Sequence, residues 1–121
     1  MINTIFLSTD NNFSLNFEPF LNSIKLFKPL VTVKSKDDCV ESVLENQPEL
    51  AIIDFDSISG DSMYLIRELL QMSSSLQILL ITTGLPLNLL KTVGKFKNLQ
   101  ILYKPFDEKM FYEKLKSIND T

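Results

Sequence analysis

Five short apolar runs alternate with helix-length segments along this chain of 121 residues. The runs are rich in Ile, Leu, Val and Phe, and they span about Thr4–Ser8, Leu30–Lys34, Leu50–Ile53, Ile78–Ile81 and Leu99–Tyr103. Nearly continuous apolar runs of this length are typical of strands that are buried on both faces of a parallel sheet. The pattern therefore predicts an α/β fold in which crossover helices join five parallel strands.

The segments between the runs carry helix signals. Ser35 is a predicted N-cap, and Asp37 and Asp38 would lie favourably in the first turn of the helix that it starts. Pro19 is tolerated best in a first helical turn, so the first helix is expected to follow an irregular segment, Asp10–Asn16. Gly94 makes the fourth helix short and weak. The other predicted helices are Phe17–Phe27, Lys36–Gln47, Asp61–Met72 and Asp107–Asn119.

Composition favours one soluble domain over residues 1–121, with 45% hydrophobic and 22% charged residues. A net charge of −3 argues against general nucleic-acid binding, because a basic surface is needed to neutralise phosphates. No apolar stretch approaches the roughly 20 residues that span a bilayer, and the N-terminus lacks the basic region of a signal peptide. The lone cysteine, Cys39, cannot form an internal disulfide, so we expect a cytoplasmic protein.

The chain contains no histidine, which excludes Ser-His-Asp and Cys-His catalysis and any histidine metal ligand. It also excludes a phosphohistidine on this chain. If the chain accepts phosphoryl groups, their donor must therefore be another protein or a small molecule. We do not expect an enzyme, beyond phosphoryl transfer to the chain itself and autodephosphorylation.

Four polar residues, Asp10, Asp54, Thr82 and Lys104, lie at or just beyond the C-terminal ends of apolar runs. Ligands of open parallel sheets bind beyond these strand ends, so two carboxylates, a hydroxyl and an ammonium are predicted to converge. That set suits metal-assisted phosphoryl chemistry on an aspartate. Each residue also has an ordinary structural interpretation: a strand-end cap for Asp54, turn chemistry for Asp10, a strand threonine and a solvated edge lysine.

Three motifs carry a resemblance to a known family. They are Gln47-Pro48-Glu49-Leu50-Ala51-Ile52-Ile53-Asp54, Ile78-Leu79-Leu80-Ile81-Thr82-Thr83 and Tyr103-Lys104-Pro105-Phe106. In this order and spacing the chain resembles, over essentially its whole length, the receiver domain of bacterial two-component response regulators. The resemblance implies a doubly wound, flavodoxin-like (CheY-like) sheet with strand order 2-1-3-4-5.

The resemblance also implies roles for individual residues. Asp54 would accept a phosphoryl group from the phosphohistidine of a histidine kinase or a phosphotransfer protein, Lys104 would pair with a phosphoryl oxygen, and Thr82 would be the switch hydroxyl. Mg²⁺ would be held by Asp10, Asp54 and the main-chain carbonyl of Asp56. The signal would leave through the fourth helix, fifth strand and fifth helix, towards an output protein or a second copy of the chain.

Departures from the family pattern favour an alternative. Thr9 stands where the first of two adjacent acids is usual, which should weaken Mg²⁺ binding without abolishing it, although the Asp56 carboxylate could add a ligand. Ile101 replaces an aromatic residue, Tyr103 being the nearby aromatic, and the loop over residues 55–60 lacks the usual Met-Pro. The alternative is a degenerate receiver that serves as a phosphorylation-independent interaction module. A third hypothesis, a flavodoxin-like nucleotide or flavin binder, is disfavoured because the chain has no glycine-rich phosphate loop.

Overall fold

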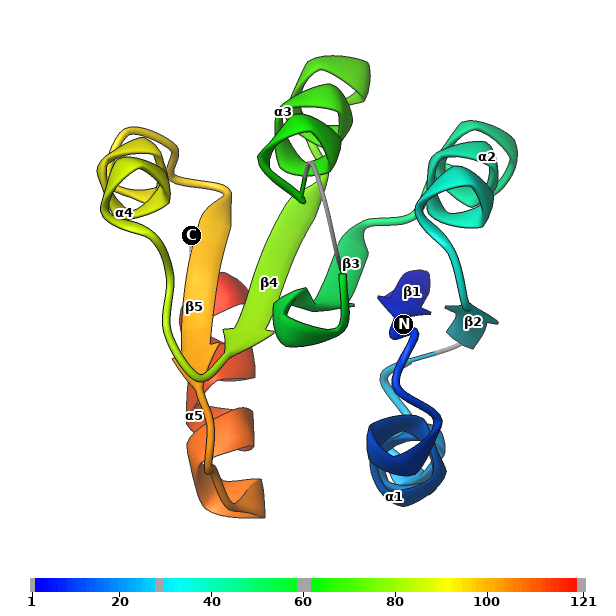
Figure 1. Cartoon of the computed structure of the whole chain (residues 1–121). Coiled ribbons are helices and arrows are strands. Elements are labelled where there is room, and N and C mark those ends of the chain that lie inside the picture. The colour runs from blue at the N-terminus through cyan, green and yellow to red at the C-terminus, as the bar shows by residue number, and fades with distance from the viewer. Residues whose placement is uncertain (1, 28–29, 59–61, 120–121) are drawn as a thin grey trace.

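The computed structural model describes residues 2–27, 30–58 and 62–119, and within them five parallel strands form one sheet (Figure 1). The strand order is β2-β1-β3-β4-β5, with every neighbouring pair parallel. The strands are β1 (Thr4–Leu7), β2 (Leu30–Val33), β3 (Leu50–Asp54), β4 (Gln77–Thr82) and β5 (Leu99–Tyr103). The predicted α/β class and strand order are both confirmed.

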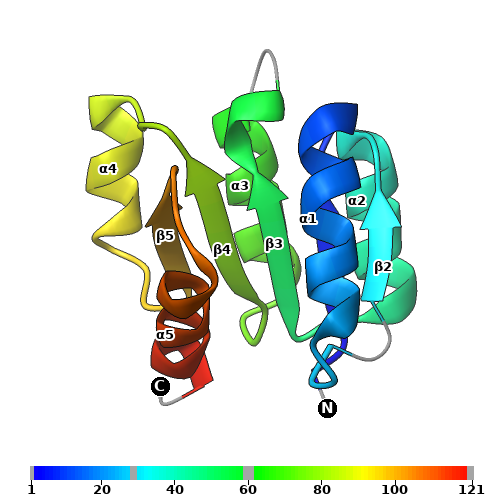
Figure 2. The ribbon, with the colours of Figure 1, turned by 90° about the horizontal axis from the view of Figure 1, so that it is seen from below.

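Helices cover both faces of the sheet (Figures 1 and 2). Helices α1 and α5 lie on one face, and α2, α3 and α4 lie on the other. The helices are α1 (Asn11–Ser23), α2 (Lys36–Asn46), α3 (Ser62–Met72), α4 (Leu87–Val93) and α5 (Glu108–Asn119), and a 3₁₀ turn, η1 (Phe55–Ser57), follows β3. No helix within the described residues is long and apolar enough to cross a membrane.

The two-sided burial explains why the strands are apolar without interruption. Along β1, Ile5 and Leu7 face the cluster under α2, α3 and α4, whereas Phe6 faces the cluster under α1 and α5. In β3, Ile53 faces the first of these clusters and Ile52 faces the second. All five side chains are fully buried, so an alternating polar pattern would have placed polar groups in the core on one face.

Helix α1 differs from its prediction. It begins at Asn11 instead of after Asn16, so the segment expected to be irregular is helical, and Pro19 lies inside the helix. Asp10 starts the helix early because its carboxylate accepts hydrogen bonds from backbone N–H groups of the first turn. Pro19 is exposed, so the carbonyl that loses its helical partner can be hydrated. Packing of Phe17 and Leu21 in the core outweighs that local loss.

Other local expectations are confirmed. The Ser35 hydroxyl caps α2 by accepting a hydrogen bond from the backbone N–H of Asp38. Helix α4 is short and ends at Gly94. Burial raises the pKa of the Cys39 thiol to about 12, which matches an inert core side chain. The predicted start of the third helix, Asp61, lies outside the described residues.

Gln47, which follows α2, has a positive φ of 45° in the left-handed region. Glycine adopts this conformation without the steric cost that a side chain brings. Its greater entropy in the unfolded chain offsets part of that gain in stability. Gln47→Gly should therefore raise the free energy of unfolding by about 0.5–1 kcal/mol. Glu45→Gly, at an exposed position inside α2, should lower it by a similar amount. Urea titrations measure both changes, and a loss of stability in Gln47→Gly would contradict the left-handed assignment.

Candidate functional site

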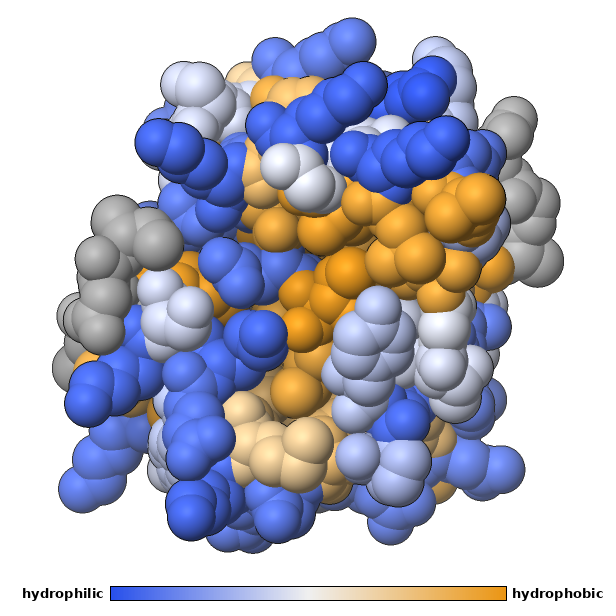
Figure 3. All heavy atoms as spheres, turned by 90° about the vertical axis from the view of Figure 1, so that its left-hand side faces the viewer, coloured by the Kyte–Doolittle hydropathy of each residue, from blue (hydrophilic) through white to orange (hydrophobic). Residues whose placement is uncertain are grey.

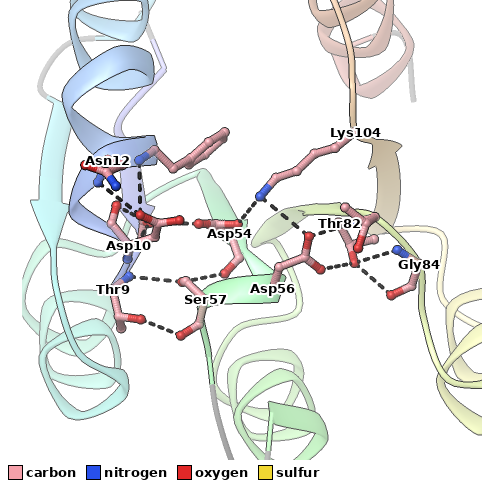
Figure 4. A network of polar contacts seen from close by, with 12 residues as sticks. Thr9, Asp10, Asn12, Asp54, Asp56, Ser57, Thr82, Gly84 and Lys104 are labelled. Atoms are coloured by element: carbon pink, nitrogen blue, oxygen red, sulfur yellow. Dashed lines mark hydrogen bonds and ion pairs between the residues drawn. The ribbon is translucent and has the colours of Figure 1, made fainter.

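The strand ends bring three of the four predicted site residues together, as Figure 4 shows. Asp54 is the last residue of β3, Thr82 is the last residue of β4, and Lys104 directly follows β5. The strands are parallel and adjacent in the order β3-β4-β5, so their C-terminal ends meet at one edge of the sheet. Ser8, which follows β1, joins them and was not among the predicted site residues.

Asp54 is the most buried charged residue of the site, with 1% of its surface exposed. Its Oδ1 lies 2.8 Å from Nζ of Lys104, and its Oδ2 accepts a hydrogen bond from the Ser8 hydroxyl at 2.8 Å. The lysine ammonium also lies 4.2 Å from the centre of the Phe13 ring. A buried carboxylate is tolerated only when it is paired and hydrogen-bonded, and both of its oxygens are satisfied here.

Asp56, in η1, directs its carboxylate to the ends of β4 and β5. Its Oδ1 accepts a hydrogen bond from the Thr82 hydroxyl at 2.6 Å, and its Oδ2 accepts one from the backbone N–H of Thr83 at 2.9 Å. Nζ of Lys104 lies 3.5 Å from the same Oδ2. Burial by itself raises the pKa of Asp56, but the two hydrogen bonds and the lysine charge outweigh it and hold this pKa below its usual value.

The Thr82 hydroxyl has one hydrogen and two acceptors within reach. Asp56 Oδ1 is 2.6 Å away and the main-chain oxygen of Gly84 is 2.8 Å away. A hydrogen bond to a carboxylate is the stronger of the two, so the hydroxyl is directed at Asp56. The backbone N–H of Gly84 in turn donates to the hydroxyl oxygen at 3.1 Å. The predicted switch residue is therefore engaged in this structure.

The Asp10 carboxylate makes its hydrogen bonds at the start of α1. Asp10 is exposed, and its Oδ1 accepts hydrogen bonds from the backbone N–H groups of Asn12 at 3.0 Å and Phe13 at 3.2 Å. This is helix-capping geometry, close to the turn chemistry that the sequence offered as the ordinary interpretation. Its predicted metal-binding role stays a prediction.

Strand pairing explains why Ser8 reaches Asp54. Leu7 is paired with Ile53 in the parallel register of β1 and β3, so the next residues, Ser8 and Asp54, lie side by side. The signal that could have identified Ser8 is its position, because it is the first polar residue after the apolar run, as Asp54 is in its own strand.

Thr9 faces the loop after β3. Its backbone N–H donates to the Ser57 hydroxyl at 3.0 Å, and its own hydroxyl donates to the main-chain oxygen of Ser57. The Ser57 hydroxyl in turn donates to the main-chain oxygen of Asp54 at 2.8 Å. The two side chains that the end of β1 brings to Asp54 and its loop are thus hydroxyls, those of Ser8 and Thr9.

The residues present do not fit Mg²⁺ well. Within the described part of the chain, no group of three or more acidic, histidine or cysteine side chains could hold a metal ion. The two carboxylates that are close together, Asp54 and Asp56, both contact the Lys104 ammonium. A divalent ion would have to compete with that cation for the same oxygens.

A scan of protein-family models and a search of curated proteins find no match to the chain. Solved structures do match it. A putative pilus assembly protein, CpaE, from Burkholderia thailandensis is 14% identical over the whole of both chains, with a TM-score of 0.80. Chemotaxis protein CheY4 from Vibrio cholerae is 12% identical over 98% of each chain, with a TM-score of 0.81. A signal receiver domain of an HD domain-containing protein from Pseudomonas fluorescens is 14% identical, covers 98% of this chain and 94% of its own, and has a TM-score of 0.82.

The chain has the fold of a CheY-like receiver domain. The predicted family resemblance is confirmed at the level of the fold. Asp54, Thr82 and Lys104 occupy the strand ends that the resemblance assigned to them. The identities are too low to carry function across, and the chemistry must be argued from the residues of this chain.

The ion pair of Lys104 with Asp54 should be essential to stability. Lys104→Met leaves the Asp54 charge buried without its cation, and we expect it to lower the free energy of unfolding by about 3 kcal/mol. Adding Asp54→Asn to that variant should recover part of the loss, because the uncompensated charge is removed. Lys97→Met, at an exposed position, should change stability by less than about 0.5 kcal/mol. Denaturant titrations measure all three, and a near-neutral Lys104→Met would exclude this interaction as a main support of the site.

Asp56 should make the stability depend on pH. Because its pKa is lowered in the folded state, its contribution is complete above the unfolded value of about 3.9 and is lost as the pH falls through the folded value. Asp56→Asn should therefore be less stable than the wild type near neutral pH, by less than about 1 kcal/mol for a partly exposed group. The difference should shrink below about pH 4. Thermal melts between pH 3 and 7 test this, and a gap that stays constant over that range would contradict it.

Proposed function

We propose that this chain is a signalling domain of the receiver fold that contacts protein partners without requiring phosphorylation of Asp54. The observation that carries the proposal is the end of β1, where Ser8 and Thr9 present hydroxyls. A carboxylate that attacks phosphorus must approach an anion, so additional positive charge has to screen the two partners. With a hydroxyl at Thr9 in place of an acid, the only carboxylate just after β1 is that of Asp10, whose Oδ1 already caps α1, so this end of β1 is a weaker ligand for a divalent cation.

Phosphoryl acceptance is the second candidate function, and a specific observation favours it. Asp54 is buried beside the Lys104 ammonium at 2.8 Å, and the Thr82 hydroxyl lies at the neighbouring strand end. In this version a histidine kinase or a phosphotransfer protein would be the donor, and the phosphoryl oxygens would bind to Lys104 and Thr82. The proposal and this alternative share the fold, and they differ in whether Asp54 is phosphorylated.

The partner surface in both versions is the face formed by α4, β5 and α5. Figure 3 shows apolar side chains gathered in a band on this side of the molecule. Leu87 is 70% exposed, and Leu90, Tyr103 and Met110 are also exposed large hydrophobic residues. A groove between β5 and α5 is lined by Ile101, Leu102, Tyr103, Met110, Glu113, Lys114 and Ser117. An exposed apolar patch beside the edge strand of a sheet suits a protein partner, either an output protein or a second copy of this chain.

The proposal places residues 1–121 in the cytoplasm as one interaction domain.

Ile101 and Tyr103 line the same groove of this face, so an aromatic group is still available at the surface although Ile101 itself is aliphatic. In this arrangement Tyr103 contributes contact area to a partner, because its side chain is exposed.

Treatment with acetyl phosphate and Mg²⁺, followed by intact-mass measurement, tests the proposed function. The wild type should show no phosphoryl adduct, and Mg²⁺ should not shift its melting temperature. The variant Thr9→Asp adds a carboxylate at the exposed position beside Asp10 and should acquire a Mg²⁺-dependent stabilisation on the order of 1 kcal/mol. That variant serves as the positive control for metal binding.

A wild-type adduct that disappears in Asp54→Asn and is labile to hydroxylamine, as acyl phosphates are, would overturn the proposal in favour of phosphoryl acceptance. An adduct that persists in Asp54→Asn would reflect modification elsewhere and would leave Asp54 unmodified.

A further inference from the structure

The carboxylate of Asp56 is bound by a set of hydrogen-bond donors that lie at the ends of other strands. The set consists of the Thr82 hydroxyl, the backbone N–H of Thr83 and the Lys104 ammonium, which we call the anion cradle. The three donors lie at the ends of β4 and β5, whereas Asp56 lies in η1 after β3. Figure 4 shows the Asp56 side chain between Lys104 on one side and Thr82 and Gly84 on the other.

The donors of the anion cradle would suit any anionic oxygen ligand. A hydroxyl, an N–H group and an ammonium are the donors that charged oxygens prefer, and carboxylate and phosphoryl oxygens accept from them in the same way. Lys104 contacts the Asp54 carboxylate at 2.8 Å and the Asp56 carboxylate at 3.5 Å, so the cradle borders directly on Asp54. A phosphoryl group on Asp54, or an inorganic anion beside it, would need these same donors.

We propose that Asp56 is a built-in ligand of the anion cradle, which takes the place of a phosphoryl group and fixes the loop from β4 to α4 without modification. This inference rests on the proposed function and supplies its regulation. It gives the loop a permanent anion to bind, because Asp56 is part of the chain and its binding costs no association entropy.

Charge balance supports the proposal. Two carboxylates, Asp54 and Asp56, share one ammonium, so the pocket already carries a net negative charge of one unit. An incoming anion would be repelled by Asp56 and would also lose the donors that Asp56 holds. Asp56 therefore competes with every other anionic ligand of the cradle.

The contacts also link the Asp56 carboxylate to helix α4, which belongs to the partner surface. Thr82 ends β4 and Thr83 follows it, and the Thr82 hydroxyl oxygen accepts a hydrogen bond from the backbone N–H of Gly84. Two residues later, Pro86 begins the first turn of α4, whose Leu89 is fully buried in the core. Fixing Thr82 and Thr83 thus fixes the point from which α4 departs.

Removal of the Asp56 carboxylate tests the inference directly. Asp56→Ala should shift the amide NMR signals of Thr83, Gly84 and α4, whereas Asp37→Ala, which removes the same charge from an exposed position on α2, should leave them unchanged. Inorganic phosphate, added at constant ionic strength against chloride, should then bind Asp56→Ala at least about tenfold more tightly than the wild type, since a repelling neighbour is gone. Bound phosphate should move the shifted signals back towards their wild-type positions.

Asp56→Asn provides a second, more conservative variant. Its amide oxygen can still accept one of the hydrogen bonds but carries no charge, so its phosphate affinity should lie between those of the wild type and Asp56→Ala. Equal phosphate binding by the wild type and Asp56→Ala would overturn the inference. Shifts confined to the residues adjacent to position 56 would also overturn it, because the loop and α4 would then not depend on the occupant.

These outcomes are separable from those of the phosphorylation test. The NMR experiment needs neither Mg²⁺ nor a phosphodonor, and it reads binding and loop position in the unmodified chain. If the wild type forms an adduct on Asp54 while Asp56→Ala behaves as expected, the proposed function fails and the role of Asp56 stands.

Discussion

The geometry of the site depends on one cation reaching two carboxylates across the end of the sheet. Strand β4 lies between β3 and β5, so Lys104 must span about two strand spacings, close to 10 Å, to contact Asp54. Its long side chain covers that distance while 19% of it remains exposed, and the Phe13 ring borders the ammonium. Without this contact the buried carboxylate at the end of β3 would be an unpaired charge, which is among the least favourable features a protein core can contain.

The same arrangement limits what the pocket can do. An active phosphoryl site needs a surplus of positive charge, because the acceptor and the transferred group are both anionic. Here the two carboxylates, Asp54 and Asp56, outnumber the one ammonium, and Ser8 at the end of β1 contributes a hydroxyl to Asp54 and no charge. The fold thus brings Asp54, Thr82 and Lys104 together, while the balance of charge among the side chains of the pocket favours a pocket that is already satisfied.

A satisfied pocket still has consequences for the surface. The residues that contact Asp56 lead directly into the loop before α4, and α4 has only seven residues, with one of them fully buried. A helix this short has little stability of its own, so its position depends on its two ends and on its packing. On the proposed role of Asp56, the exposed apolar band beside α4 would depend on the group that occupies the donors at the end of β4.

The sequence alone determined the strands, their parallel arrangement and three site residues, Asp54, Thr82 and Lys104. It could do so because a strand that is buried on both faces is a continuous apolar run, and the polar residue that ends each run can be recognised in the sequence. The strand order came from the family resemblance and not from the periodicity. Side-chain direction at the end of β1 depended on tertiary structure, since the pairing register places Ser8 beside Asp54 and leaves Asp10 to cap a helix.

The tertiary structure also decided the start of α1 and the role of Asp56. The sequence predicts Pro19 in a first turn, but the Asp10 cap starts the helix at Asn11 and core packing of Phe17 and Leu21 carries it through Pro19. The sequence suggested the main-chain carbonyl of Asp56 as a ligand, whereas the folded chain directs its carboxylate towards donors more than 20 residues away. Contacts between distant segments follow from how strand ends meet in space, and that geometry is not encoded in the pattern of any single segment.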